Sequence, residues 1–178
     1  MNHILALDIG ASKYIAGLID ASGRVLYERR GVWRELTQAC VLETILREAQ
    51  AVLCVSTERP AACGVTIPGL ADPERGFWVE AQLSGIRDFA ICEQLEAALG
   101  MPCYCDNDGK AYALAEMLFG ACQDVRDFLC INISTGIGGS IVSGGRLLRG
   151  ANGSAGEIGH WVIVENGRSE EHTSELQS

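Results

Sequence analysis

Two short glycine-containing turns, each set between apolar runs, constrain most strongly what this chain can fold into. The first turn covers residues 8–13 and the second covers residues 134–139. The flanking runs have the length of strands: 4–7 and 14–19 around the first turn, 128–133 and 140–143 around the second. A turn this short joins strands that run antiparallel. The same strand–turn–strand unit is therefore expected twice, on either side of a boundary near Gly120.

Helical and extended segments alternate between these two units. Apolar residues at helical spacing predict a helix beginning at Thr37 and two more over 89–99 and 108–119. Further strands are expected at 24–29, 61–67, 77–80, 103–105 and 146–148. The pattern predicts an α/β fold, with a first lobe over residues 1–120 and the truncated start of a second lobe over residues 121–167.

The chain is acidic, with a formal net charge of -9 and no cluster of lysines and arginines. This argues against nucleic acid or an anionic membrane as a partner. No apolar stretch reaches the roughly 20 residues that span a membrane, and the first residues do not resemble a signal peptide. The 8 cysteines form no C-x-x-C pair, so we expect reduced core thiols in a cytoplasmic protein.

Residues 168–178 differ in style from the rest of the chain because they are polar and aperiodic. In order, they match the translation of a short-read sequencing adapter. We therefore expect this segment not to be native and the reading frame of the gene to continue beyond Gly167. His172 lies in this segment and is expected to carry no function.

The first turn has the residue types of a phosphate site. Gly10 lets backbone N–H groups approach a phosphate closely. Asp8, at the end of a strand, could hold Mg²⁺, and Ser12 and Lys13 could donate to phosphate oxygens. The alternative is an ordinary hairpin with a polar turn, which this motif alone favours.

Thr135, Gly136 and Gly138 belong to the second turn, which again joins strand to strand. Ile141 interrupts the G-x-G-x-x-G spacing and no helix follows, so a dinucleotide fingerprint is disfavoured. The turn also lacks the Gly-Lys-Ser/Thr ending of a P-loop. Two such turns, one from each half, favour a clamp for the phosphates of a nucleotide.

Two polar segments carry groups suited to binding and activating a sugar. Asp108 could act as general base on a sugar hydroxyl, and Asn107 could orient the sugar. The alternative for Asp108 is a simple helix N-cap. In the glycine-rich loop 150–160, Glu157 could accept hydrogen bonds from hydroxyls, and His160 could bind sugar or metal. A purely structural histidine is the alternative for His160.

Together these motifs resemble the ROK family (repressor, open reading frame, kinase) of the actin-like ATPase and sugar-kinase superfamily. The resemblance covers residues 4–164 and is closest at 153–160, Gly-Ser-Ala-Gly-Glu-Ile-Gly-His. Residues 106–109, Asp-Asn-Asp-Gly, and 64–69, Gly-Val-Thr-Ile-Pro-Gly, fit the family as well. The resemblance implies an actin-like (ribonuclease H-like) fold and ATP-dependent phosphorylation of a hexose.

The family implies roles for the matching positions. Asp108 would be the catalytic base. The sugar would be bound by Asn107, Asp108, Glu157, His160 and the backbone of Gly69. The ATP phosphates and Mg²⁺ would be surrounded by Asp8, Gly10, Ser12, Thr135, Gly136 and Gly138. His160 would also bind a structural zinc, whose partner cysteines are missing because their expected place begins near Glu170.

Three positions depart from the family pattern. Ala11 replaces a usual glycine in the first turn, which narrows the room near a phosphate. Gln82 stands where many members carry asparagine, so the choice of sugar stays open. Lys110 stands where asparagine is usual, one turn from Asp108.

The family also contains sugar-responsive repressors, which carry a winged helix-turn-helix ahead of the kinase-like fold. Here the first turn begins at Asp8, and with the acidic charge this favours an enzyme. A ROK-type regulator and a catalytically silent sugar-binding module are the alternatives. Glucose is the first expectation for the substrate and N-acetylmannosamine the second. We expect the complete protein to be a homodimer that uses ATP, Mg²⁺ and zinc, and the 178-residue chain to be inactive.

Overall fold

The computed structural model describes residues 3–81, 85–134, 136–163 and 167. It divides into two compact units, Met1–Asp108 and Gly109–Ser178. The first contains a five-stranded and a three-stranded sheet, and the second contains a three-stranded sheet. The lobes predicted from the sequence, 1–120 and 121–167, differ from this division by about one helix and remain a prediction. Residues 168–178, which we expect not to be native, lie outside the described residues.

The first unit is built on a five-stranded sheet with the strand order β3-β2-β1-β4-β8. Its strands are β1 (Ile4–Ile9), β2 (Lys13–Ile19), β3 (Val25–Val32), β4 (Ala62–Ile67) and β8 (Cys103–Asn107). The predicted antiparallel meander of β1, β2 and β3 is confirmed, while β4 and β8 run parallel to β1. The carboxyl ends of β1, β4 and β8 therefore meet at one edge of the sheet, where open α/β sheets bind their ligands.

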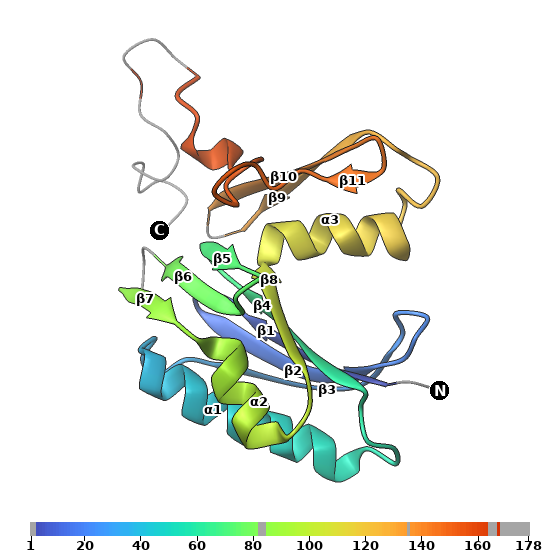
Figure 1. The fold of residues 1–178 in the computed structure, drawn as a ribbon, viewed down its shortest axis with the longest axis vertical. Coiled ribbons are helices and arrows are strands. Elements are labelled where there is room, and N and C mark those ends of the chain that lie inside the picture. Colours follow the sequence, from blue (N-terminus) through green and yellow to red (C-terminus); the bar gives the residue numbers. More distant parts are fainter. Residues whose placement is uncertain (1–2, 82–84, 135, 164–166, 168–178) are drawn as a thin grey trace. The chain divides into compact units, whose positions relative to one another are not determined.

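Two helices, α1 (Gln38–Val55) and α2 (Ile91–Leu99), pack side by side on one face of this sheet (Figure 1). Side chains alternate along β1, and Leu5, Leu7 and Ile9 are fully buried in the core. Thr37 caps α1 through its hydroxyl, which accepts from the backbone N–H of Cys40, so the predicted helix start is confirmed.

The buried cysteines are part of this core. All 8 thiols are free, and Cys63 and Cys103 lie opposite one another on β4 and β8. The hydrogen bond with Cys103 and burial raise the pKa of the Cys63 thiol. A thiol that stays protonated is a poor nucleophile, which applies to Cys63. The hydrogen bond with Cys92 instead lowers the pKa of the Cys105 thiol.

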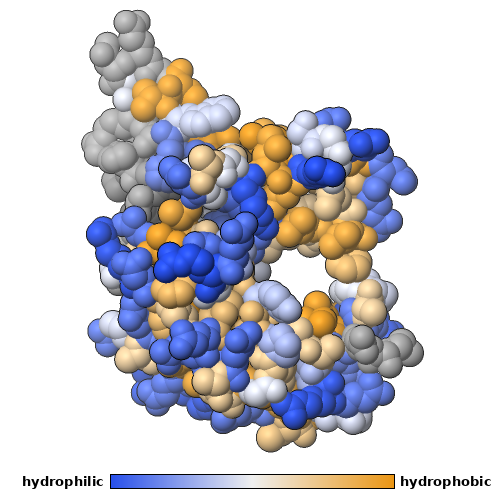
Figure 2. Space-filling model, in the orientation of Figure 1, coloured by the Kyte–Doolittle hydropathy of each residue, from blue (hydrophilic) through white to orange (hydrophobic). Residues whose placement is uncertain are grey.

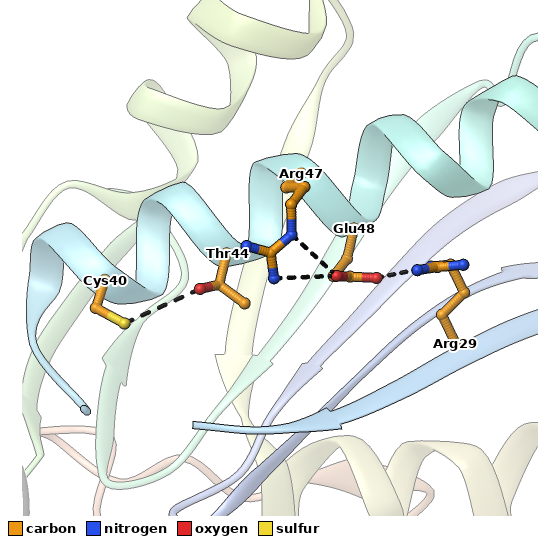
Figure 3. A network of polar contacts seen from close by, with 5 residues as sticks. All are labelled: Arg29, Cys40, Thr44, Arg47 and Glu48. Atoms are coloured by element: carbon orange, nitrogen blue, oxygen red, sulfur yellow. Dashed lines mark hydrogen bonds and ion pairs between the residues drawn. The ribbon is translucent and has the colours of Figure 1, made fainter. Parts of the chain in front are cut away.

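A network of polar contacts ties α1 to the edge of the sheet (Figure 3). The buried carboxylate of Glu48 accepts from Arg29 Nε of β3 at 2.7 Å and from Arg47 Nη2 at 3.1 Å. The hydrogen bond from Arg29, followed by that from Arg47, holds the pKa of Glu48 below its ordinary value against the opposing effect of burial. On the same helix, Sγ of Cys40 lies 4.0 Å from Oγ1 of Thr44.

A small antiparallel sheet of β5 (Leu70–Asp72), β6 (Phe77–Ala81) and β7 (Ile86–Phe89) follows β4. The prediction of a helix starting at Phe89 is wrong, because Phe89 pairs with Trp78 across β6 and β7. The helix α2 starts at Ile91, and Gly100 ends it in the left-handed conformation with φ 65°, as expected for a glycine cap. Gln82, the second departure from the family, lies outside the described residues.

The second unit holds most of α3 (Asp108–Leu118) and an antiparallel sheet of β9 (Phe128–Ile133), β10 (Ile137–Ser143) and β11 (Arg146–Leu147). A glycine-rich loop then leads into the short 3-10 helix η1 (Ile158–His160). The second turn is shorter than predicted, because Ile137, Gly138 and Gly139 already pair with β9 as part of β10. The predicted hairpin over Gly144 and Gly145 is confirmed.

Several apolar side chains of this unit are exposed, as Figure 2 shows. The exposed positions of β9 are Leu129, Ile131 and Ile133, of which Ile133 is 72% exposed. They alternate with half-buried residues, so one face of the strand is uncovered.

In the part of the chain that the structure describes, no helix is both long and apolar enough to cross a membrane.

Candidate functional site

The first turn is positioned by the pairing of β1 with β2. The N–H of Gly10 donates to the carbonyl of Lys13 at 2.9 Å and closes the turn. A Cβ on Gly10 would lie 3.0 Å from that carbonyl, so a larger residue crowds the turn. Ser12 and Lys13 are exposed at its tip, where their side chains are accessible to a ligand.

Asp8 lies at the carboxyl end of β1, beside β4. Its Oδ1 accepts from the hydroxyl of Thr66 at 2.6 Å, and the two residues are register partners in the parallel pair. This bond fixes the carboxylate at the sheet edge. A half-buried carboxylate at such an edge has the oxygen chemistry that Mg²⁺ prefers.

Trp33 braces the first turn from the end of β3. Its indole Nε1–H donates to the carbonyl of Gly10 at 2.9 Å, and its backbone N–H donates to the carbonyl of Ser12 at 3.4 Å. The centroid of its ring lies 4.7 Å from the ring centroid of Tyr14. Trp33 could not be predicted as a site residue from the sequence, because its hydrogen-bond partners come from a turn two strands earlier.

The junction of β8 and α3 brings together the predicted catalytic and sugar-binding side chains of the first unit. Asn107 is buried at the end of β8, and its Nδ2 donates to the carbonyl of Gly69 at 2.8 Å and to Asp108 Oδ1 at 3.1 Å. Gly69 has φ 81°, in the left-handed region that favours glycine. Asp108 is the first residue of α3 and is half-buried. The amide therefore orients the carboxylate that we predict to be the base.

In the second unit, the turn between β9 and β10 is closed by the Ser134 N–H, which donates to the carbonyl of Gly136 at 2.9 Å. Gly138 pairs with Asn132 on β9, and a Cβ there would collide with Oδ1 of Asn132 at 2.5 Å. A larger residue at this position of β10 would therefore require the Asn132 side chain to shift. Thr135, a predicted phosphate ligand, lies outside the described residues.

The glycine-rich loop of the second unit holds Glu157 and His160 at the two ends of η1. Glu157 Oε1 lies 3.3 Å from Nζ of Lys110, a buried lysine on α3. His160 is exposed at the end of η1, and its backbone N–H donates to the carbonyl of Glu157 at 3.2 Å. The sequence singled out Lys110 beside Asp108, but it did not indicate the pairing with Glu157.

The described residues contain no group of three or more His, Cys, Asp or Glu side chains that could hold a metal ion. His160 is thus the one predicted zinc ligand that the described residues contribute. For Mg²⁺, the residue in place is Asp8, whose second carboxylate oxygen can bind a hydrated cation.

Comparison with solved structures shows the class of fold to which this chain belongs. The ROK family glucokinase from Streptomyces griseus, solved in complex with glucose and AMPPNP, matches with a TM-score of 0.86 and 28% identity over 97% of this chain and 57% of that chain. The protein has the actin-like ATPase fold, as predicted.

Sequence comparison identifies the family within that class. The ROK family model matches residues 4–171, and the chain belongs to the ROK family. N-acetylmannosamine kinase from Salmonella paratyphi A is 36% identical over 92% of this chain and 55% of its own length. The DNA-binding transcriptional dual regulator NagC from Escherichia coli is 34% identical over 89% of this chain and 40% of its own length. The chain thus spans about half, or less, of these relatives.

Proposed function

We propose that the complete protein is an ATP-dependent hexose kinase. The observation that carries the proposal is the β8–α3 junction, where the buried amide of Asn107 holds the Asp108 carboxylate at the start of a helix. A sugar hydroxyl is a weak nucleophile until a base accepts its proton. The proposal is also supported by the kinases among the relatives.

In this proposal Asp108 is the catalytic base, and the sugar is bound by Asn107, Glu157, His160 and the backbone of Gly69. Amide and carboxylate groups suit hydroxyls because they offer donors and acceptors side by side. The carbonyl of Gly69 already accepts from Asn107, so it acts by orienting that amide as well.

The ATP phosphates are assigned to the two glycine-containing turns. The assigned residues are Asp8, Gly10, Ser12, Lys13, Thr135, Gly136 and Gly138. Mg²⁺, held through Asp8, would offset the charge of the transferred phosphoryl group. A structural zinc at His160 is a further part of the proposal for the complete protein.

Glucose is the first candidate substrate, because one similar kinase was solved in complex with glucose. N-acetylmannosamine is the second, because another similar kinase is named for that sugar. We further propose a cytoplasmic homodimer without nucleic-acid or membrane partners. The free thiols support the reducing compartment, and the acidic charge supports the absence of nucleic acid.

A sugar-responsive transcriptional regulator is the second candidate, favoured by the 34% identity to NagC over 89% of the chain. Both candidates bind a sugar, and they differ in whether phosphate is transferred and whether DNA is bound. Catalysis therefore discriminates between them.

The test is ATP turnover by the product of the complete gene over a panel of hexoses, coupled to ADP detection. Asp108→Asn should lower kcat by about a hundredfold or more, because it removes a general base and keeps the size of the side chain. Sugar binding, measured by calorimetry, should change little. Turnover that survives Asp108→Asn would refute the assigned base, and sugar and operator binding without turnover would establish the regulator instead.

A further inference from the structure

Lys110 is unusual in its burial. It is one of two lysines in the chain, which otherwise carries its positive charge on arginines. Its side chain is 2% exposed, whereas that of Glu157 is 31% exposed. A buried ammonium group is stable when an anion compensates its charge. At 3.3 Å, the Glu157 carboxylate provides that charge from the glycine-rich loop.

The backbone on either side of Glu157 is also fixed. The Ile158 N–H donates to the carbonyl of Gly156 at 2.7 Å. Gly156 packs against β10, where a Cβ would lie 2.9 Å from the carbonyl of Gly139. Glu157 is therefore held at its backbone by the loop and at its side chain by α3.

The geometry also limits what Glu157 can bind. Its Oε1 is engaged by Lys110, and within the described residues no contact of Oε2 is found. A carboxylate with two available oxygens can accept from two vicinal hydroxyls at once. Lys110 fills one of the two acceptor sites of Oε1 and fixes the orientation of the carboxylate, so Oε2 is the oxygen whose two acceptor sites are both open to a hydroxyl of the sugar.

We propose that Lys110 is a positioning residue that sets sugar specificity by presenting Glu157 to one hydroxyl of the hexose. This inference rests on the proposed function, in which Glu157 binds the sugar. The substrate class is a hexose that donates this single hydroxyl, with substitution tolerated at the neighbouring carbon. Asparagine, the residue usual at this position by family resemblance, carries no charge to fix the carboxylate.

The experiment uses the complete gene product and compares the wild type with Lys110→Met, Lys110→Arg, Glu157→Gln and the Lys110→Met/Glu157→Gln double variant. KM and kcat are measured for ATP, for the best hexose and for its monodeoxy analogues. Lys110→Met should raise the hexose KM about tenfold or more, because a hydrogen bond to a charged group is lost. The KM for ATP should stay within about twofold.

Two further results are expected. The preference for the hexose over the analogue that lacks the recognised hydroxyl should collapse in Lys110→Met. In the Glu157→Gln background the same change should have little additional effect, because the two residues act as one unit. A purely structural role would instead lower stability and leave this preference unchanged.

The matched control is Arg24→Met, which removes the ion pair of Arg24 with Asp20 on the exposed β2–β3 turn. It should leave every kinetic constant unchanged. If Lys110→Met does not fold, Lys110→Arg tests the inference instead. This variant keeps the positive charge but shifts the Glu157 carboxylate, so it should still raise the hexose KM without raising the KM for ATP.

The inference is overturned by an unchanged sugar preference in the folded Lys110 variants, or by additive effects in the double variant. Failure of the proposed function has a different signature, because the wild type would then phosphorylate no hexose of the panel. In that case the increase in Tm that each sugar or deoxy analogue causes is measured in place of KM, as the readout of sugar binding. An equal shift for the wild type and Lys110→Met would overturn the inference.

Discussion

At the scale of single residues, two carboxylates stabilise the first unit in a pH-dependent way. Asp20 accepts from the hydroxyl of Ser22 at 2.6 Å, and this bond, with others from the turn, lowers its pKa to about 2 from 3.8. The bond from Arg29 likewise lowers the pKa of Glu48 from 4.5. A carboxylate whose pKa is lower in the folded state stabilises the protein above its unfolded pKa, and this stabilisation is lost as the pH falls.

We therefore expect the free energy of unfolding to fall as the pH drops from about 5 to about 2. Asp20→Asn and Glu48→Gln should each be less stable than the wild type at neutral pH and lose less over this range. Denaturant titrations at several pH values measure the effect. Glu28→Gln, which removes an exposed ion pair with Arg30, is the control and should follow the wild type. Parallel curves for all four proteins would contradict the assignment.

The sequence could indicate Asn107 and Asp108 because they are adjacent and lie between an apolar strand and an apolar helix. It could not indicate the pairing of Lys110 with Glu157. These residues are separated by 47 positions, and only the folded loop brings them together. The contact of Trp33 with the first turn could not be predicted either, because a tryptophan after a strand is ordinarily a core residue.

At the scale of elements, the brace between Trp33 and the first turn should control nucleotide binding. Trp33→Phe keeps an aromatic ring beside Tyr14 but removes the Nε1–H donor to Gly10. We expect the KM for ATP to rise by about two- to tenfold, the equivalent of one net hydrogen bond. The hexose KM should not change. Tyr104→Phe, at an exposed position of β8, is the control; equal effects on both substrates would argue against a local brace.

The contact between β10 and the glycine-rich loop makes a second prediction. Gly156 has φ 89°, and a Cβ there would lie 2.9 Å from the Gly139 carbonyl. Gly144 has φ 60° but nothing within 4 Å, so Gly144→Ala should cost only the left-handed strain, about 1–2 kcal/mol. Gly156→Ala should cost more and weaken sugar binding, as measured by denaturation and calorimetry. Equal costs would show that the contact is not required.

Long elements were more predictable than short ones. The strand over Phe128–Ile133 was predicted with its observed bounds, because its apolar run is continuous. β5 and β7 were missed because they are short and carry polar residues such as Asp72 and Arg87. Their pairing with β6, a tertiary effect, decides their structure.

At the scale of the whole molecule, the uncovered face of β9 should dominate behaviour in solution. Leu129, Ile131 and Ile133 are exposed side by side on one strand, and such patches promote association. We expect the 178-residue chain, expressed alone, to self-associate as its concentration rises. Ile131→Lys should reduce this, whereas Ile141→Lys on β10, which is half-buried, should destabilise the fold instead. Sedimentation velocity measures the effect, and a monomer at every concentration would contradict it.

The burial of Lys110 has a practical consequence for chemical labelling. Amine-reactive reagents modify accessible primary amines, and arginine is not among their targets. With Lys110 shielded at 2% exposure, Lys13 is the one exposed lysine side chain in the chain. A single probe can therefore be attached, apart from the amino terminus, at the tip of the first turn. That turn can be followed spectroscopically without first removing competing lysines by mutation.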